Sequence, residues 1–120
     1  MADRMLFISW GAPVRGMEGR SLEVFNEAIG LLGRMQQDGR IESMDVALLA
    51  PNADLNGYVA VHGTAAQIDA LRQDEEFLRS TADAMMIVDK LRHVEGYTNE
   101  GVARQMGIFQ DAIAKVPQRA

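Results

Sequence analysis

The amino-acid sequence predicts a single α+β domain over residues 1–120, in which helices cover one face of a four-stranded antiparallel sheet. Three observations lead to this fold class. Short segments with alternating apolar residues, typical of strands, are separated by segments with apolar residues at helical spacing. No repeat, low-complexity tract or linker interrupts them. A chain of this length buries roughly two thirds of its unfolded surface, which is enough for one stable domain without disulfides.

The first strand is predicted at Met5 to Trp10, where apolar residues occupy both faces, so we expect a central strand that is covered on both sides. A loop rich in glycine and proline follows it. Ser21 is a suitable N-cap for the first helix, and Gly39 is a suitable residue to end it. The alternation along the strand places Leu6, Ile8 and Trp10 on one face and Met5, Phe7 and Ser9 on the other.

The second and third strands are predicted at Ile41 to Ala50 and at Tyr58 to His62, and the short connection between them makes them antiparallel neighbours. That connection, residues 51–57, contains Pro, Asn, Asp and Gly, which are common in turns. Directly after the third strand, Thr64 and Gln67 have the spacing of a capping box, which predicts the start of the second helix.

The second helix is expected to break near Asp74, because this residue and the two glutamates after it suit the first turn of a new helix. The fourth strand is predicted at Met86 to Tyr97. Asn99 is the expected cap of a last helix, which Pro117 stops. We expect the apolar stripe of this helix to cover an edge of its own sheet, and the alternative is that it crosses to a partner subunit and covers the mouth of the pocket. The stripe consists of Val102, Met106, Phe109, Ile113 and Val116.

The order of the elements is strand, helix, strand, strand, helix, strand, with one extra C-terminal helix. This is the split βαβ arrangement of the ferredoxin-like fold. Right-handed crossovers place both main helices on one face of the sheet. The other face carries either the set with Leu6 or the set with Met5, and both sets are too apolar to face water. We therefore expect a second copy of the chain to cover that face.

The composition excludes several classes of function. Because the chain has no cysteine, it has no disulfide, thiolate metal site or cysteine nucleophile, which fits a cytoplasmic protein. The 12 basic and 17 acidic residues give a net charge of −5 without a basic run, so neither nucleic acid nor a membrane is an expected partner. We expect no signal peptide, and no spacing of histidines predicts a metal site.

Three short motifs carry a resemblance to a known superfamily: Val61-His62-Gly63-Thr64 where a strand meets a helix, Asp74-Glu75-Glu76-Phe77 where a helix restarts, and the closing Gly96-Tyr97. Together with the order of elements, they resemble the dimeric α+β barrel proteins, which include antibiotic-biosynthesis-monooxygenase-like and YCII-related proteins. The resemblance implies a homodimer of two ferredoxin-like subunits packed sheet against sheet. It also implies a pocket between sheet and helices, without fixing one chemistry.

His62 is the candidate catalytic residue, because an imidazole at a strand end can act as a general base; a purely hydrogen-bonded or solvent-facing histidine is the alternative. We expect Tyr58 and Trp10 to form the walls of a pocket for a small organic molecule, although both can equally be packing residues. The predicted function is small-molecule binding, with cofactor-independent monooxygenase or isomerase-like activity. The alternative is a non-catalytic binding or interaction protein whose sheet face serves only dimerisation.

Arg15 and Arg20 lie next to the expected start of the first helix, so they are candidate ligands for a carboxylate or another anion. The loop that holds them lacks the glycine and lysine pattern of a phosphate-binding loop, and ordinary solvated arginines are the alternative. His93 lies in the predicted fourth strand. The strand order of the fold does not make it a neighbour of His62, so we expect no metal site and no cofactor.

Overall fold

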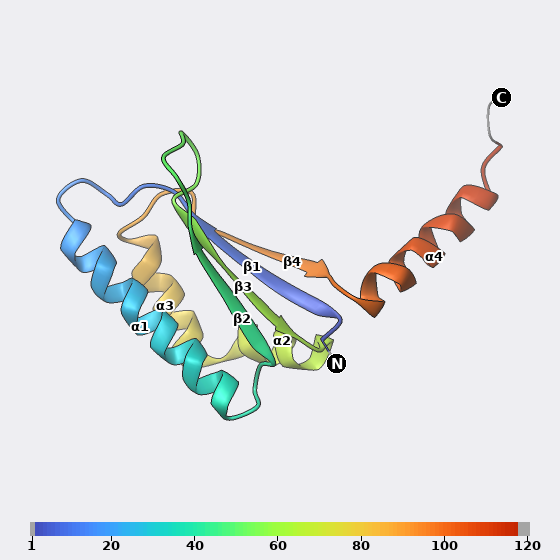
Figure 1. The fold of residues 1–120 in the computed structure, drawn as a ribbon, viewed down its shortest axis with the longest axis horizontal. Coiled ribbons are helices and arrows are strands. Elements are labelled where there is room, and N and C mark those ends of the chain that lie inside the picture. Colours follow the sequence, from blue (N-terminus) through green and yellow to red (C-terminus); the bar gives the residue numbers. More distant parts are fainter. Residues whose placement is uncertain (1, 118–120) are drawn as a thin grey trace.

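The computed structural model describes residues 2–117 and contains the predicted order of strands and helices (Figure 1). The four strands of the described residues form a single sheet, and three helices precede the last strand. A fourth helix follows it. The elements are β1 (Arg4–Trp10), α1 (Glu18–Gln37), β2 (Ser43–Leu48), β3 (Gly57–Gly63), α2 (Ala65–Gln73), α3 (Glu75–Met85), β4 (Arg92–Tyr97) and α4 (Glu100–Ala114).

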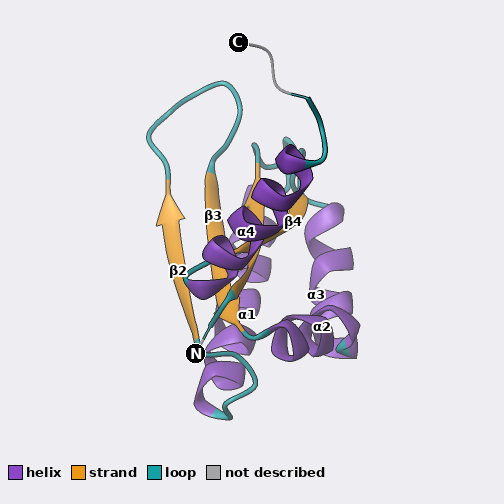
Figure 2. Ribbon diagram, turned by 90° about the vertical axis from the view of Figure 1, so that its right-hand side faces the viewer, coloured by secondary structure: helices purple, strands orange, loops and turns teal. Residues whose placement is uncertain are grey.

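The four strands form an antiparallel sheet in the order β2-β3-β1-β4, so β1 and β3 are central and β2 and β4 are its edges (Figure 2). Helices α1, α2 and α3 lie on one side of this sheet (Figure 1). The predicted ferredoxin-like α+β fold with an extra C-terminal helix is therefore confirmed. We call the side without these three helices the open face; its side chains include Met5, Phe7, Tyr58, Ala60 and His62.

The helices cover the face of β1 that carries Leu6, which settles the choice that the sequence left open. Leu6 pairs with Val61 in β3, and both side chains are fully buried. Because directly opposed residues of an antiparallel pair share a face, the rest of the sheet follows from this register. The buried cluster under the helices consists of Leu6, Leu31, Leu32, Met35, Ile41, Val59, Val61, Ile68, Leu71 and Phe77.

Three helix ends in the structure agree with those predicted from the sequence, and at each of them a side chain or a glycine determines the end. The capping box is confirmed: Thr64 Oγ1 accepts from the backbone N–H of Gln67 at 3.2 Å, and the Gln67 side chain accepts from the backbone N–H of Thr64 at 2.8 Å. Gly39 follows the end of α1 with φ of 75°, in the left-handed region that favours glycine. Asp74 accepts from the backbone N–H of Phe77 and so starts α3 after the predicted break.

One predicted helix cap is wrong, and another is confirmed in its position but not in its side-chain hydrogen bond. Helix α1 begins at Glu18, so Ser21 lies inside it, and its hydroxyl donates instead to the carbonyl of Ile87 at 3.1 Å. Asn99 occupies the N-cap position of α4, but its side-chain amide donates to the carbonyl of Ala2. In both places a contact with a distant part of the chain replaces the local bond that the sequence suggests.

Helix α4 extends away from the rest of the domain, on the side opposite to α1 and α3 (Figure 1). Among the described elements it makes appreciable contact only with β4. The Cα radius of gyration is 17.2 Å, compared with about 14 Å for a compact domain of this length. The expectation that α4 covers an edge of its own sheet is therefore wrong, and its apolar stripe is exposed. Between residues 2 and 117, no helix combines the length and apolar character needed to span a bilayer.

Candidate functional site

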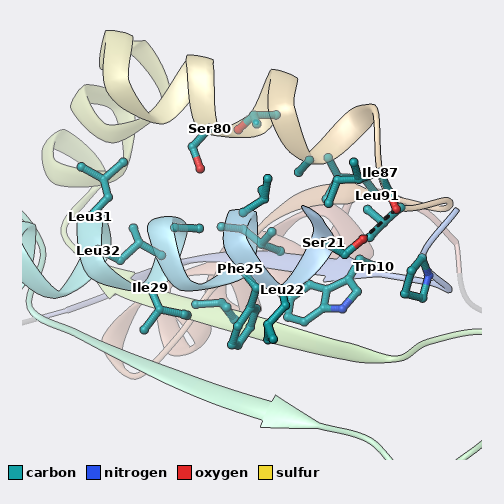
Figure 3. Close-up of a pocket in the computed structure, with 18 of the residues that line it drawn as sticks. Trp10, Ser21, Leu22, Phe25, Ile29, Leu31, Leu32, Ser80, Ile87 and Leu91 are labelled. Carbon is teal, nitrogen blue, oxygen red and sulfur yellow. Dashed lines mark hydrogen bonds between the residues drawn. The ribbon is translucent and has the colours of Figure 1, made fainter. Parts of the chain in front are cut away.

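A cavity of about 320 Å³ lies between α1, α3 and the helix-covered face of the sheet (Figure 3). Its volume is near the lower end of the roughly 300–1,000 Å³ found for small-molecule pockets. Most of its lining is apolar. Leu22 and Leu48 line it and are 63% and 73% exposed, so the cavity opens to solvent between α1 and β2. Such a site suits a small, mostly apolar molecule.

The wall next to the sheet is built around Trp10, the last residue of β1. Its indole packs against Phe25 of α1, with ring centroids 5.7 Å apart. Leu22, Phe25 and Ile29 share one face of α1 because they are three and four residues apart, and Figure 3 shows all three pointing toward the sheet. Aromatic and aliphatic surfaces therefore enclose the cavity on this side, and the predicted role of Trp10 as a pocket wall remains a proposal with this geometry behind it.

His93 of β4 also lines the cavity, although the sequence analysis assigned it no role. It pairs with Ile8 of β1 and so shares the helix-covered face. The half-buried imidazole stacks near Phe77, with ring centroids 5.5 Å apart. Burial lowers the pKa of His93 below its ordinary value, and the positive charge of Arg72 lowers it further. At neutral pH this imidazole is therefore uncharged, and its unprotonated nitrogen can accept a proton.

Three hydroxyl groups line the α1 and α3 sides of the cavity. Ser21 donates to the carbonyl of Ile87 (Figure 3), and Thr81 donates to the carbonyl of Phe77 at 2.9 Å. The hydroxyl of Ser80 points into the cavity in Figure 3, and no residue of the described part of the chain hydrogen-bonds to it. Ser80 and His93 are thus the two polar groups best placed to orient a ligand.

His62 lies elsewhere, on the open face, where Nε2 is 2.9 Å from Oδ2 of Asp45 on β2. On the same face the ring of Tyr58 is 5.0 Å from that of Phe7. Trp10 lies on the opposite face, because His62 pairs with Met5 and side chains alternate along β1. The predicted group of His62, Tyr58 and Trp10 is therefore divided between the two faces, and one protomer cannot bring all three around one ligand.

The two arginines predicted to hold an anion lie at the start of α1. Arg15 is exposed in the loop before the helix. The guanidinium of Arg20 contacts Glu23 at 3.0 Å, Glu27 at 3.4 Å and Asp83 at 3.8 Å. These carboxylates already neutralise Arg20, so its contacts give no support to the anion site, which stays a prediction. Within residues 2–117, no group of three or more His, Asp or Glu side chains is placed to hold a metal ion.

No family model and no curated protein matches the sequence. Three solved structures have a similar fold. A dimeric ferredoxin-like protein of unknown function from Bacteroides fragilis matches with a TM-score of 0.60 at 11% identity, covering 79% of this chain and 96% of that one. Hydroxynitrile lyase from Passiflora edulis matches with a TM-score of 0.60 at 11% identity, covering 83% and 97%. A Chloroflexus aurantiacus protein, provisionally named an antibiotic biosynthesis monooxygenase, matches with a TM-score of 0.54 at 13% identity, covering 80% and 93%.

These similarities show the fold, because all three identities are far below the level at which a shared activity follows. They agree with the resemblance inferred from the order of elements. The dimeric state, the lyase activity and the monooxygenase assignment belong to those proteins.

The residues that the sequence analysis missed are His93 and Ser80. The signal for His93 was present, since it lies on a predicted strand that pairs with β1. It was not usable without knowing which face of β1 the helices cover. Ser80 carried no signal, because a single serine within a helix is most often exposed.

Proposed function

We propose that this protein is a homodimeric α+β barrel that binds a small, mostly apolar organic molecule with one polar group in the cavity. The observation that carries the proposal is that the half-buried His93 imidazole and the Ser80 hydroxyl both line a mostly apolar cavity. An apolar pocket with few, convergent polar groups and a titratable residue of shifted pKa is the usual form of a binding or active site. An aromatic ring with a hydroxyl or carbonyl group fits this lining.

The homodimer is supported by the open face of the sheet. Val94 on β4 is exposed there beside Phe7, and Tyr58 continues the apolar surface across β3. A sheet face of this kind is usually covered in a stable protein. Two copies related by a two-fold axis cover each other's open face, which also places the His62–Asp45 pair inside the barrel. One of the structurally similar proteins is described as dimeric.

The reaction that the cavity supports is removal of a proton from the bound molecule. The uncharged imidazole of His93 accepts the proton from a hydroxyl or an activated C–H group and becomes an imidazolium. The anion left on the ligand accepts a hydrogen bond from Ser80, which stabilises it in an apolar surrounding. This step needs no cofactor, and it can begin the monooxygenase or isomerase-like activity that the sequence suggested.

The test uses 4-nitrophenol, whose neutral and anionic forms absorb at different wavelengths. Binding to the wild-type protein is expected to keep the probe neutral near neutral pH and to shift its absorption, because the uncharged His93 accepts a hydrogen bond from the phenol and the apolar lining disfavours a pair of charges. His93→Leu removes this acceptor and should abolish the shift, whereas His62→Gln should keep it. The opposite pattern would assign the base to His62, as the sequence analysis predicted. A dimer that binds no aromatic probe would contradict the proposal and favour a protein whose sheet face serves only dimerisation.

A further inference from the structure

Helix α4 has one uncharged apolar face and one charged face. At 100° per residue, Val102, Met106 and Phe109 lie within one narrow sector, and Phe109 is 59% exposed. The charged residues of the helix lie on the other side. They are Glu100, Arg104 and Asp111, with Lys115 at the C-cap. A helix with this division is built to bury one face against an uncharged surface.

The chain offers such a surface between α1 and β2. We call it the α1–β2 groove, and none of its five residues is charged. Two of them, Leu22 and Leu48, are largely exposed, and this is also where the cavity opens to solvent. The groove consists of Leu22, Phe25 and Ile29 from α1 and Val46 and Leu48 from β2.

Within one protomer, α4 begins at the opposite end of the sheet from the α1–β2 groove. In the register, Tyr97 of β4 is level with Arg4 of β1, whereas Leu48 of β2 is level with Gly57, which pairs with Trp10. Figure 1 shows α4 rising from the Tyr97 end on the side of the open face, where a partner subunit would lie. The helix therefore extends toward the partner and away from its own groove.

A two-fold axis that lies between the two sheets and runs diagonally to the strands exchanges both the ends and the edges of the sheets, and β4 and β2 are opposite edges. The Tyr97 corner of one protomer then lies against the Leu48 corner of its partner. Packed sheets are about 10 Å apart, and the 15 residues of α4 span roughly 22 Å. That length reaches past the partner's sheet to its helix layer. An axis along the strands would instead place α4 near Arg40 and Glu42, where its apolar face would meet charges.

We infer that α4 of each protomer docks in the α1–β2 groove of its partner and closes the mouth of the partner's cavity. The inference rests on the proposed homodimer. A typical stable interface buries roughly 800 Å² of accessible surface per partner, and an interface through the open face alone leaves the exposed apolar face of α4 uncovered. Docking of α4 supplies the additional contact. Each ligand site is then complete only in the dimer, because the partner's helix forms part of its wall.

Disulfide trapping tests the contact, because the natural chain has no cysteine. Met106→Cys and Leu48→Cys chains with different affinity tags are co-expressed and oxidised. A covalent heterodimer is expected, and since each chain has one cysteine, a bond within a chain cannot imitate it. Arg104→Cys, on the charged face of α4, is the matched control and should give little heterodimer with Leu48→Cys. Equal trapping by both would overturn the inference.

A second cysteine position checks the orientation. Ser43 lies at the other end of β2. If Met106→Cys forms a disulfide with Ser43→Cys and not with Leu48→Cys, α4 does not dock in the α1–β2 groove. The inference would then be overturned, although the protein would still be a dimer.

Charge substitution measures the contribution of α4 to the dimer. Phe109→Glu should raise the dimer dissociation constant at least about tenfold, and Arg104→Glu should change it by less than about twofold, both by analytical ultracentrifugation. A wild-type monomer would overturn both this inference and the proposed dimer. A wild-type dimer that Phe109→Glu leaves intact, with no disulfide between positions 106 and 48, would overturn only the inference about α4.

Discussion

Trp10 and Gly57 are cross-strand partners, and the indole of Trp10 lies in the space that a side chain at position 57 would fill. A Cβ built on Gly57 would be 2.8 Å from Cζ2 of the indole and 2.7 Å from the backbone carbonyl of Ala47. The carbonyl cannot move without disturbing the pairing of β2 and β3. The absence of a side chain at position 57 therefore allows Trp10 to take its place in the wall of the cavity.

Gly57→Ala is expected to displace the indole and to lower the free energy of unfolding by about 1–3 kcal/mol, the usual cost of overpacking. The emission spectrum of Trp10, which is the sole tryptophan, should shift at the same time. Gly33→Ala in α1 is the matched control, because nothing lies within 4 Å of a Cβ there. It should be neutral or stabilise by about 0.5–1 kcal/mol. Equal effects of the two substitutions in chemical denaturation would show that the contact with Trp10 does not matter.

The capping box at the start of α2 gives a second prediction. Thr64→Ala removes the side-chain acceptor for the backbone N–H of Gln67 and should destabilise the protein by about 1 kcal/mol. Thr64→Ser keeps the hydroxyl and should recover most of that loss. Denaturant titration of the three proteins measures the difference. If the serine variant is as unstable as the alanine variant, the methyl group of Thr64 is more important than the cap.

The half-buried state of His93 predicts how stability depends on pH. Its pKa is lowered in the folded protein from the ordinary 6.5, chiefly by burial. Below that value the unfolded chain binds a proton that the folded chain does not, so the free energy of unfolding falls as the pH drops below 6.5. It levels off once the pH is below the folded pKa. His93→Gln should remove this part of the pH dependence, and denaturation curves at several pH values measure it. A variant with the same pH dependence as wild type would show that another group is responsible.

Much of the fold could be predicted from the sequence because local patterns determine it. The alternation in β1, the capping box at Thr64 and the break at Asp74 all depend on neighbouring residues. The start of α1 could not be predicted in this way. The hydroxyl of Ser21 donates a hydrogen bond to the backbone carbonyl of Ile87, which is distant in sequence. Helix α1 begins at Glu18, without a side-chain cap.

The candidate site was harder to predict because it depends on register and on which face is covered. Both faces of β1 are apolar, so the pattern of Leu6 and Met5 could not show where the helices pack. The register then decides which histidine faces the cavity. It pairs His93 with Ile8 on the covered face and His62 with Met5 on the open face. The position of α4 is likewise not a local property, since within residues 2–117 only β4 makes appreciable contact with this helix.

The central claim is that the cavity beside Trp10 binds a small aromatic molecule, and the fluorescence of this one tryptophan tests it most directly. Titration with 4-nitrophenol should quench the emission to saturation in the wild-type protein. Ala84→Leu, which places three extra carbon atoms in the cavity lining, should weaken binding at least about tenfold. Ala82→Leu, on the exposed side of the same helix, should bind like wild type. Equal quenching in all three proteins, or none in any, would contradict the claim.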